Sequence, residues 1–291
     1  MNSTNPKKRK DSIFKFDKMI GVPYYILLVT LIVFPLLIMI LYSFQDKNQN
    51  GLLTSEFSIN HYMAFFEQVE FVRAMGYSIL LAVIATTLTL LFAYPTAYFL
   101  VHKKVRTQVL YLSLISGTMW INMILRTNAV MQILMLLDEH LGTRTMRTNG
   151  ASVFGMVYMY FPYMFLPIYT VLSKMDYKLF EASNDLGANK FQTLVRVVMP
   201  LSIPGVLSGI IMVLLPATTT VVIPAYLGPT TQLFIGQIIE GTYKQNGVNS
   251  GAINKAAAMA VALGVIMIGI MFLINLLDPK RRGEVKNEQK G

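Results

Sequence analysis

The sequence predicts an all-α membrane protein with six transmembrane helices. Hydrophobic residues make up 54% of the 291 residues and charged residues only 14%, well below the roughly 25% charged residues of an average soluble domain. The apolar residues are concentrated in runs long enough to cross about 30 Å of hydrocarbon as helices. The chain has no cysteine, so disulfides and thiolate metal sites are excluded.

Six apolar runs reach the length of a transmembrane helix. The expected spans are Val22–Phe44, Tyr77–Val101, Val109–Leu137, Val153–Leu172, Ile203–Leu227 and Ala256–Leu277. Together they form one transmembrane domain, residues 22–277, between a basic N-terminal segment (1–21) and a C-terminal tail (278–291). The first run is long and lacks a small-residue cleavage pattern at its end, so we expect a retained span rather than a signal peptide.

The lysines and arginines predict the orientation. With the N-terminus in the cytoplasm, 18 of them lie in inner segments and 6 in outer ones. Carboxylates divide almost evenly, as a rule based on Lys and Arg rather than on net charge requires. We therefore expect both termini and the loop 173–202 to be cytoplasmic. This topology accounts for the formal charge of +10, so no nucleic-acid partner is needed.

The fifth run, "LLPATTTVVIPAYLG", is the best candidate for a translocation path. Prolines inside a helix free a carbonyl group and bend the helix. A broken helix at membrane depth is tolerated where neighbours or a water-filled cavity satisfy its backbone. The expected path residues here are Thr218, Thr219, Thr220 and Tyr226. The alternative is that membrane helices are simply richer in Pro than soluble ones.

Arg126, in "WINMILRTNAV", is the only ionisable residue well inside an apolar run. On a straight third span it lies about 30 Å above the inner turn, where it reaches the outer headgroups by snorkelling or sits with Asn122 at the outer mouth of a path. No Asp, Glu, Lys or His lies in the middle of a span, so the charge relays of proton- or sodium-coupled transporters are missing.

Catalytic motifs are also missing. The chain has no Walker-type phosphate loop, no His/Glu metal cluster and no G-x-S-x-G elbow, so we expect no enzyme activity, metal site or cofactor in this chain.

The polar stretch "FEASNDLGANKFQTLVRVVMPLSIPG", residues 180–205, lies in the cytoplasmic loop. Asp176 can cap a short helix on which Leu179, Ala182, Ser183 and Leu186 share one face. Gly187 is placed to stop this helix in a left-handed conformation, and Pro200 introduces the next span. The helix suits either docking in a groove of another protein or lying on the inner leaflet.

The same residues carry a resemblance to a family. The stretch resembles the E-A-A, three residues, G, nine residues, I-x-L-P loop of permease subunits in bacterial ATP-binding-cassette (ABC) importers. Here the pattern consists of Glu181, Ala182, Ser183, Gly187, Val197, Met199 and Pro200 with every spacing kept. Ser for the second Ala, Val for Ile and Met for Leu are conservative departures.

The resemblance implies a type I importer permease fold in a bacterial plasma membrane, with a cytoplasmic coupling helix formed by Glu181, Ala182, Ser183, Leu186 and Gly187 and followed by Pro200. The implied partners are a second homologous permease, two ATPase subunits that bind ATP and Mg, an extracellular substrate-binding protein and membrane lipid. Within the family, the segments "YFPYMFLPIYTVL" and "LFIGQIIE" resemble spermidine/putrescine permeases.

Permeases for thiamine, iron(III), phosphonate and sulfate are similar in the same places, so they stay open as alternatives for the cargo. Two other classes are an ATP-independent transporter or channel, which leaves the motif at 180–200 unexplained, and a membrane scaffold, which leaves the broken fifth span unexplained.

Overall fold

The computed structural model describes residues 23–45, 57–67, 69–176, 178–245 and 252–276, without the side chains of residues 64–67, 180, 181, 184 and 245. The expected basic segment 1–21 and tail 278–291 lie outside the described residues. Within the described part, regular structure is helical apart from one isolated bridge between Gln45 and Phe57. Five helices are long and apolar enough to cross a membrane, and a sharply bent helix pair gives up to six spans. The all-α membrane class is confirmed.

The chain divides into two units, and the first combines residues 1–64 with 242–262. Its described part contains the first span, Pro23–Ser43, with the π-helical turn η1 (Val29–Val33) followed by α2 (Phe34–Ser43). It also contains the beginnings of α3 (Asn60–Glu67) and α13 (Ala252–Leu276). Asn254 joins α13 to the end of the first span, because its side-chain amide donates to the carbonyl groups of Tyr42 at 3.2 Å and Gln45 at 3.1 Å.

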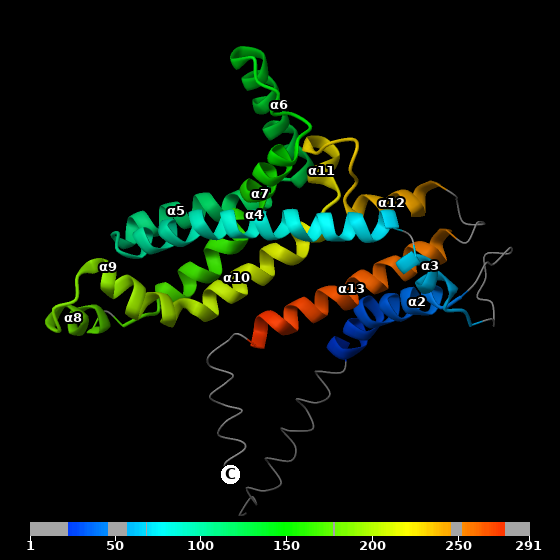
Figure 1. Cartoon of the computed structure of the whole chain (residues 1–291). Coiled ribbons are helices and arrows are strands. Elements are labelled where there is room, and N and C mark those ends of the chain that lie inside the picture. The colour runs from blue at the N-terminus through cyan, green and yellow to red at the C-terminus, as the bar shows by residue number, and fades with distance from the viewer. Residues whose placement is uncertain (1–22, 46–56, 68, 177, 246–251, 277–291) are drawn as a thin grey trace, which may run out of the picture. The chain divides into compact units, whose positions relative to one another are not determined.

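The second unit, residues 65–241 with 263–291, is built around three packed helices: α4 (Val69–Val101), α7 (Asn149–Leu172) and α10 (Met199–Thr219) (Figure 1). Met156, Met164, Phe165 and Ile168 of α7 are fully buried in this core. Since α7 is covered by neighbours on several sides, it is the central helix of the unit.

Two glycines let α10 approach α7 closely. Gly205 and Gly209 are four residues apart on α10, and a Cβ atom at either position would lie about 3.0 Å from a backbone carbonyl of α7, at Pro167 (3.0 Å) and Met164 (3.1 Å). This small-xxx-small spacing is the usual way in which membrane helices pack backbone against backbone. It fixes the register between α10 and α7.

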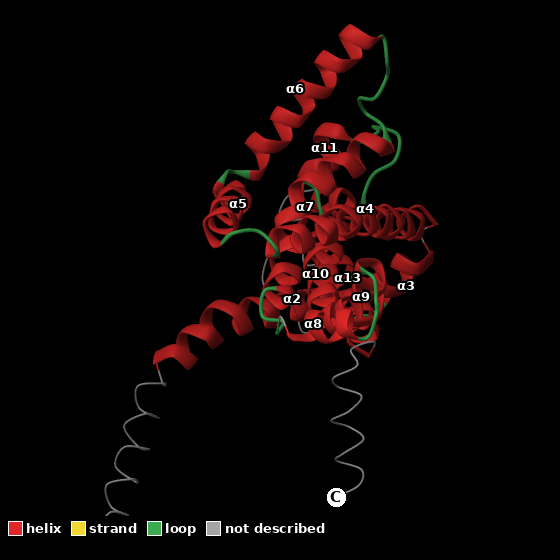
Figure 2. Ribbon diagram, turned by 90° about the vertical axis from the view of Figure 1, so that its left-hand side faces the viewer, coloured by secondary structure: helices red, strands yellow, loops and turns green. Residues whose placement is uncertain are grey.

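The third expected span is not one straight helix. Residues 105–141 form α5 (Val105–Gly117), the 3₁₀ turn η2 (Thr118–Trp120) and α6 (Met123–Leu141), and the two parts are bent by 101°. Figure 2 shows α6 leaving the end of α5 at a sharp angle. Ile121 is extended and Asn122 restarts the helix, its side-chain oxygen accepting from the amide of Ile124 at 2.8 Å. Hydropathy alone did not predict this break.

The other spans agree with expectation in place but differ at their ends. The second begins at Val69, eight residues before the expected Tyr77. The fourth begins at Asn149, where the Thr148 hydroxyl caps the helix by accepting from Ala151 N at 3.1 Å. Helix α13 runs from Ala252 to Leu276. Polar and charged residues in the first turns had hidden these starts from an apolar pattern.

The fifth span starts earlier than expected. After the short helix α8 (Lys178–Asp185), α9 (Lys190–Thr193), the π-helical turn η3 (Leu194–Val198) and α10 form one continuous helical stretch from Lys190 to Thr219. Pro200 therefore does not introduce this helix. Both π-helical turns end just before a proline, Pro35 or Pro200. Proline lacks an N–H and clashes with the carbonyl four residues back, and a wider turn relieves both problems.

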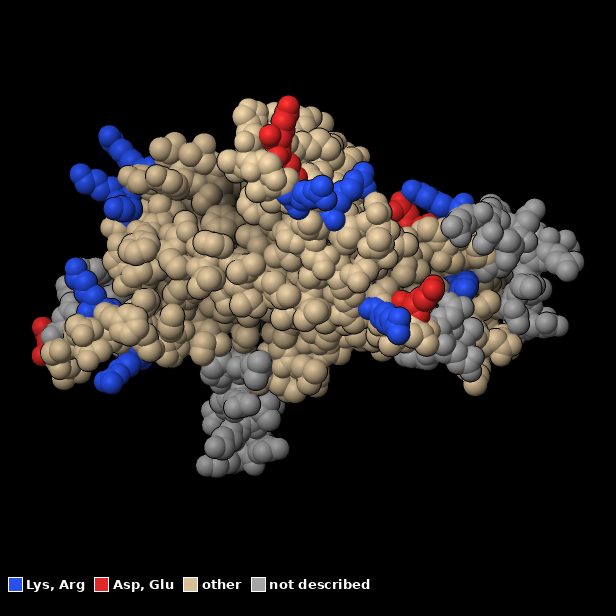
Figure 3. Space-filling model, turned by 45° about the horizontal axis from the view of Figure 1, so that its top comes forward, with Lys and Arg blue, Asp and Glu red and all other residues tan. Residues whose placement is uncertain are grey.

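After α10 the chain forms α11 (Val222–Leu227) and α12 (Ile235–Gln245). On the face shown in Figure 3, the charged side chains lie in a few separate groups and leave a broad uncharged area between them. A hydrocarbon environment requires such an uncharged surface.

Candidate functional site: the α8 loop and the break after α10

The polar stretch folds into a short, capped helix. The Asp176 carboxylate accepts from Lys178 N at 3.0 Å at the start of α8, as the sequence predicted. Gly187 has φ +81°, and the amide of Ala188 donates to the carbonyl of Ser183 at 3.1 Å. This bond spanning a left-handed glycine is the Schellman ending of a helix. The predicted left-handed stop at Gly187 is confirmed.

Helix α8 has an exposed apolar edge. Leu186 is 89% exposed and Leu179 is 41% exposed, and Ala182 is also exposed. Together with Gln192 and Arg196 they line a pocket of about 430 Å³. An exposed apolar edge beside a hollow is a surface on which another protein can dock.

Ser183 lines the same pocket as Leu179 and Leu186. It is buried, and its hydroxyl lies 2.8 Å from the hydroxyl of Thr193, which is also buried. Asn189 and Gln192 form a reciprocal capping box at the start of α9, with bonds of 2.9 and 2.8 Å. The Ser183–Thr193 pair therefore fixes α8 to α9, and the capping box fixes the start of α9. The side chain of Glu181 lies outside the described part of the chain.

The break between α10 and α11 falls where the sequence placed the path. Helix α10 ends at Thr219, and Thr220 is extended with ψ 138°. A helix that continued through this point would press the Pro224 ring against the carbonyl of Thr220, which favours ending α10 here. Of the expected path residues, Thr219 is exposed, Tyr226 is half-buried and Thr218 is buried, with its hydroxyl donating to Leu214 O at 2.8 Å.

Arg126 lies in the first turn of α6 and is 8% exposed. The distance of about 30 Å expected along a straight helix does not apply, because the bend at residues 118–122 redirects the chain. The side chain is packed inside the protein, so the snorkelling interpretation is wrong for this structure. Asn122, which caps α6, is exposed.

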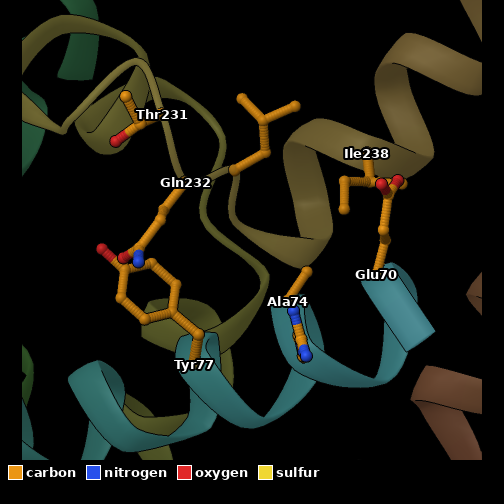
Figure 4. Close-up of a pocket in the computed structure, with 8 residues that line it drawn as sticks. Glu70, Ala74, Tyr77, Thr231, Gln232 and Ile238 are labelled. Carbon is orange, nitrogen blue, oxygen red and sulfur yellow. The ribbon is translucent and has the colours of Figure 1, made fainter.

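A further polar pocket, of about 460 Å³, was not predicted from the sequence. It lies between the first turns of α4 and the segment before α12, and its polar lining residues are Glu70, Arg73, Tyr77, Thr231 and Gln232. Figure 4 shows Glu70 and Tyr77 projecting from α4 beside Thr231, Gln232 and Ile238. The i, i+3, i+7 spacing of Glu70, Arg73 and Tyr77 places them on one face of a helix and could have indicated the pocket. The expected second span began only at Tyr77 and so left out the turns that carry Glu70 and Arg73.

Comparison with known proteins decides the family. Residues 90–283 match the model of the family described as "Binding-protein-dependent transport system inner membrane component". This chain belongs to that family of permeases. The permease is therefore a transport component and not an enzyme by itself, and membership implies a multi-pass membrane protein that works with a partner permease, ATPase subunits and a binding protein.

Curated relatives cover almost the whole permease. A protein named spermidine/putrescine transport system permease protein PotB from Haemophilus influenzae is 29% identical over 272 residues, which is 89% of this chain and 93% of the relative. The PotB proteins of Salmonella typhimurium (strain LT2) and Escherichia coli (strain K12) are each 30% identical. Their alignments cover 89% and 85% of this chain, and 92% of each relative.

Solved structures confirm the fold. A chain of a bacterial ABC transporter involved in the import of the acidic polysaccharide alginate superposes with a TM-score of 0.67 at 17% identity, over 95% of the permease and 99% of that chain. A chain of a bacterial alginate ABC transporter in complex with an alginate pentasaccharide-bound periplasmic protein gives a TM-score of 0.67 at 13% identity, over 94% of the permease and 96% of that chain. At these identities the likeness bears on the fold alone.

Proposed function

We propose that this chain is the permease subunit of an ATP-driven importer of spermidine and putrescine, and that it forms half of the translocation path. The observation that carries the proposal is the loop of the spaced motif, in which α8 is a capped helix with an exposed apolar edge and a left-handed stop at Gly187, and the rest of the motif leads through α9 and η3 to Pro200 at the start of α10. The polyamine cargo is supported by the PotB relatives, which align over nearly the full length.

Helix α8 is the element that docks on a cytoplasmic ATPase subunit. Leu186 and Ala182 supply the apolar contact and Glu181 adds a polar one, while the contact of Ser183 with Thr193 holds α8 against α9. ATP and Mg are bound by two partner ATPases, and this chain contributes no cofactor site of its own. The loop, both termini and the tail are cytoplasmic in this assembly, in line with the distribution of Lys and Arg.

The path runs past the break between α10 and α11, where Thr219 and Tyr226 offer polar groups with no fixed positive charge of their own. Asn122 lies at the mouth, and carboxylates that attract the polycation come largely from partner subunits. An extracellular binding protein delivers the cargo. Cargo selection at that earlier step leaves thiamine, iron(III), phosphonate and sulfate as the competing substrates to be tested.

The test is uptake by the whole importer. Deletion of the gene in a strain without a redundant polyamine importer should abolish uptake of labelled spermidine and putrescine, and a plasmid copy should restore it. Unchanged uptake after deletion contradicts the polyamine cargo.

Docking is tested separately, by ATP hydrolysis in proteoliposomes that contain the complete importer. Leu186→Ser removes the most exposed apolar side chain of α8, whereas Leu233→Ser removes an exposed Leu (48% exposed) from a segment distant in sequence. We expect Leu186→Ser, but not Leu233→Ser, to lower the ATPase stimulation by the loaded binding protein several-fold. Equal effects of the two variants contradict docking through α8.

A further inference from the structure

Arg126 is a buried cation with unused donors. Its Nε and Nη1 atoms are both shielded from solvent and have no hydrogen-bond partner. A guanidinium stays protonated in proteins and carries five N–H donors. Removing charged donors from water without giving them an acceptor is among the most unfavourable arrangements in a folded chain. An acceptor that is absent from this single chain would remove that cost.

A second buried polar group without a partner lies on the neighbouring element. The Thr220 hydroxyl, 6% exposed, has no hydrogen-bond partner. It lies at the break after α10, beside which the Tyr160 hydroxyl of α7 donates to Pro216 O at 3.2 Å. Helix α6, which carries Arg126, packs on α7 and on α11, the helix that follows the break, so the elements that carry the two groups are packed on one another.

The backbone adds to the positive potential at this place. Arg126 lies in the first turn of the 19-residue helix α6, and the N-terminus of a helix carries a partial positive charge. Side chains on a helix lean toward its N-terminus, so the guanidinium and the dipole act in the same region. Within the described residues, no carboxylate is placed against the buried Arg126 nitrogens.

We propose that Arg126 and Thr220 form a buried binding site for one anionic group, either a small free anion or a carboxylate supplied by the second permease subunit. A guanidinium, a hydroxyl and a helix N-terminus are together donors for negative charge. A bound anion also cancels the fixed positive charge beside the break, which would otherwise repel a cationic cargo. The site itself does not depend on the nature of the cargo, because its donors are unpaired in either case.

The first experiment measures the melting temperature, Tm, of the detergent-solubilised importer as chloride or formate replaces bulky gluconate at constant ionic strength. For a free anion, Tm of the wild type rises by several degrees, and Arg126→Gln abolishes the rise. Thr220→Val, which keeps the size of the side chain and removes the hydroxyl, reduces the rise while the importer still assembles. The matched control is Arg144→Gln, because Arg144 is exposed and its loss should leave the rise intact.

A carboxylate from the partner gives a different result. Tm of the wild type is then insensitive to the anion, and Arg126→Gln lowers co-purification of the second permease several-fold. In the Arg126→Gln background, the carboxylates of the second permease are changed one at a time to amides. Co-purification is then restored by the change at one position, the one whose carboxylate contacts Arg126. Each pattern supports the site and assigns its source.

Two outcomes overturn the site. One is an anion-dependent Tm that persists in Arg126→Gln. In the other, Tm of the wild type does not depend on the anion, and Arg126→Gln either leaves co-purification of the second permease unchanged or lowers it in a way that no change in the partner restores. In the second case Arg126→Met, which replaces a buried cation by an apolar side chain, should keep or raise Tm. Because Tm and co-purification are measured without transport, failure here is distinguishable from failure of the polyamine proposal.

Discussion

The hydroxyl groups of Ser183 and Thr193 lie 2.8 Å apart, and both residues are buried between α8 and α9. The pair joins α8 to the helix that continues into α10. Ser183 stands where the family motif has its second Ala, so the departure from the motif supplies a contact that Ala cannot make.

The contact predicts that the effects of substituting Ser183 and Thr193 are not additive. Ser183→Ala or Thr193→Val alone leaves one buried hydroxyl unpaired, at a cost of about 1–3 kcal/mol, whereas removing both partners is close to neutral. We therefore expect each single variant to lower the ATPase stimulation by the loaded binding protein, and the double variant to recover much of it. The measurement is a double-mutant cycle in proteoliposomes, and strict additivity argues against the contact.

Substitution of Gly187 should impair coupling only through its left-handed backbone conformation. A Cβ atom there meets nothing within 4 Å, but φ is +81°. A β-branched residue in this conformation costs about 1–2 kcal/mol, so Gly187→Val should uncouple ATP hydrolysis from the binding protein without preventing assembly.

Gly187→Asn provides the graded control, since Asn tolerates the left-handed region better than Val. Its defect should be clearly smaller, and Glu181→Ala should likewise give a mild defect because it removes one side chain and keeps the helix. Full stimulation with Gly187→Val favours the alternative in which α8 lies on the inner leaflet.

Substitution of Gly209 by a larger residue should destabilise the packing of α10 on α7. A Cβ atom there would lie 2.7 Å from the Met164 sulfur and 3.1 Å from the Met164 carbonyl, and the carbonyl cannot move without displacing α7. We expect Gly209→Val to cost about 1–3 kcal/mol by overpacking and to reduce the yield of assembled permease.

The matched control is Gly264→Val on α13, where an added Cβ meets nothing within 4 Å. It should leave the yield near that of the wild type. A similar loss in both variants means that valine in a membrane helix, and not the contact with α7, is responsible.

The orientation can be tested because the chain has no cysteine of its own. Lys190 and Arg144 are both exposed, and the charge distribution places the first in the cytoplasm and the second outside. An impermeant thiol reagent added to intact cells should label Arg144→Cys and spare Lys190→Cys until the membrane is permeabilised. The reverse pattern contradicts the proposed topology.

The spans and the stop at Gly187 were predictable because each depends on local sequence. A run of apolar residues is sufficient for a membrane helix, and a left-handed turn after Leu186 favours glycine whatever surrounds it. The bend between α5 and α6 was not predictable from hydropathy, since both halves are apolar. Gly117 and Asn122 were the only local signals of it.

The burial of Ser183 and of Arg126 depends on tertiary neighbours. Ser183 falls on the same helical face as Leu179 and Leu186, and only the position of α9 decides that it faces inward. Arg126 was expected about 30 Å up the helix, at the outer headgroups or at the mouth of a path, because a straight helix was assumed. Its burial follows from the bend and from the packing of α6 on α7 and α11.

The unbroken helical stretch from Lys190 to Thr219 has 30 residues, which corresponds to about 45 Å at 1.5 Å per residue. One end is fastened to α8 through Thr193, and the other ends at the break beside Thr220. A tilt of only about 5° about one end of the stretch displaces the other end by about 4 Å over that length. In the proposed importer, a small movement of α8 on the ATPase is therefore enough to shift the break at Thr220 and to widen or close the proposed path.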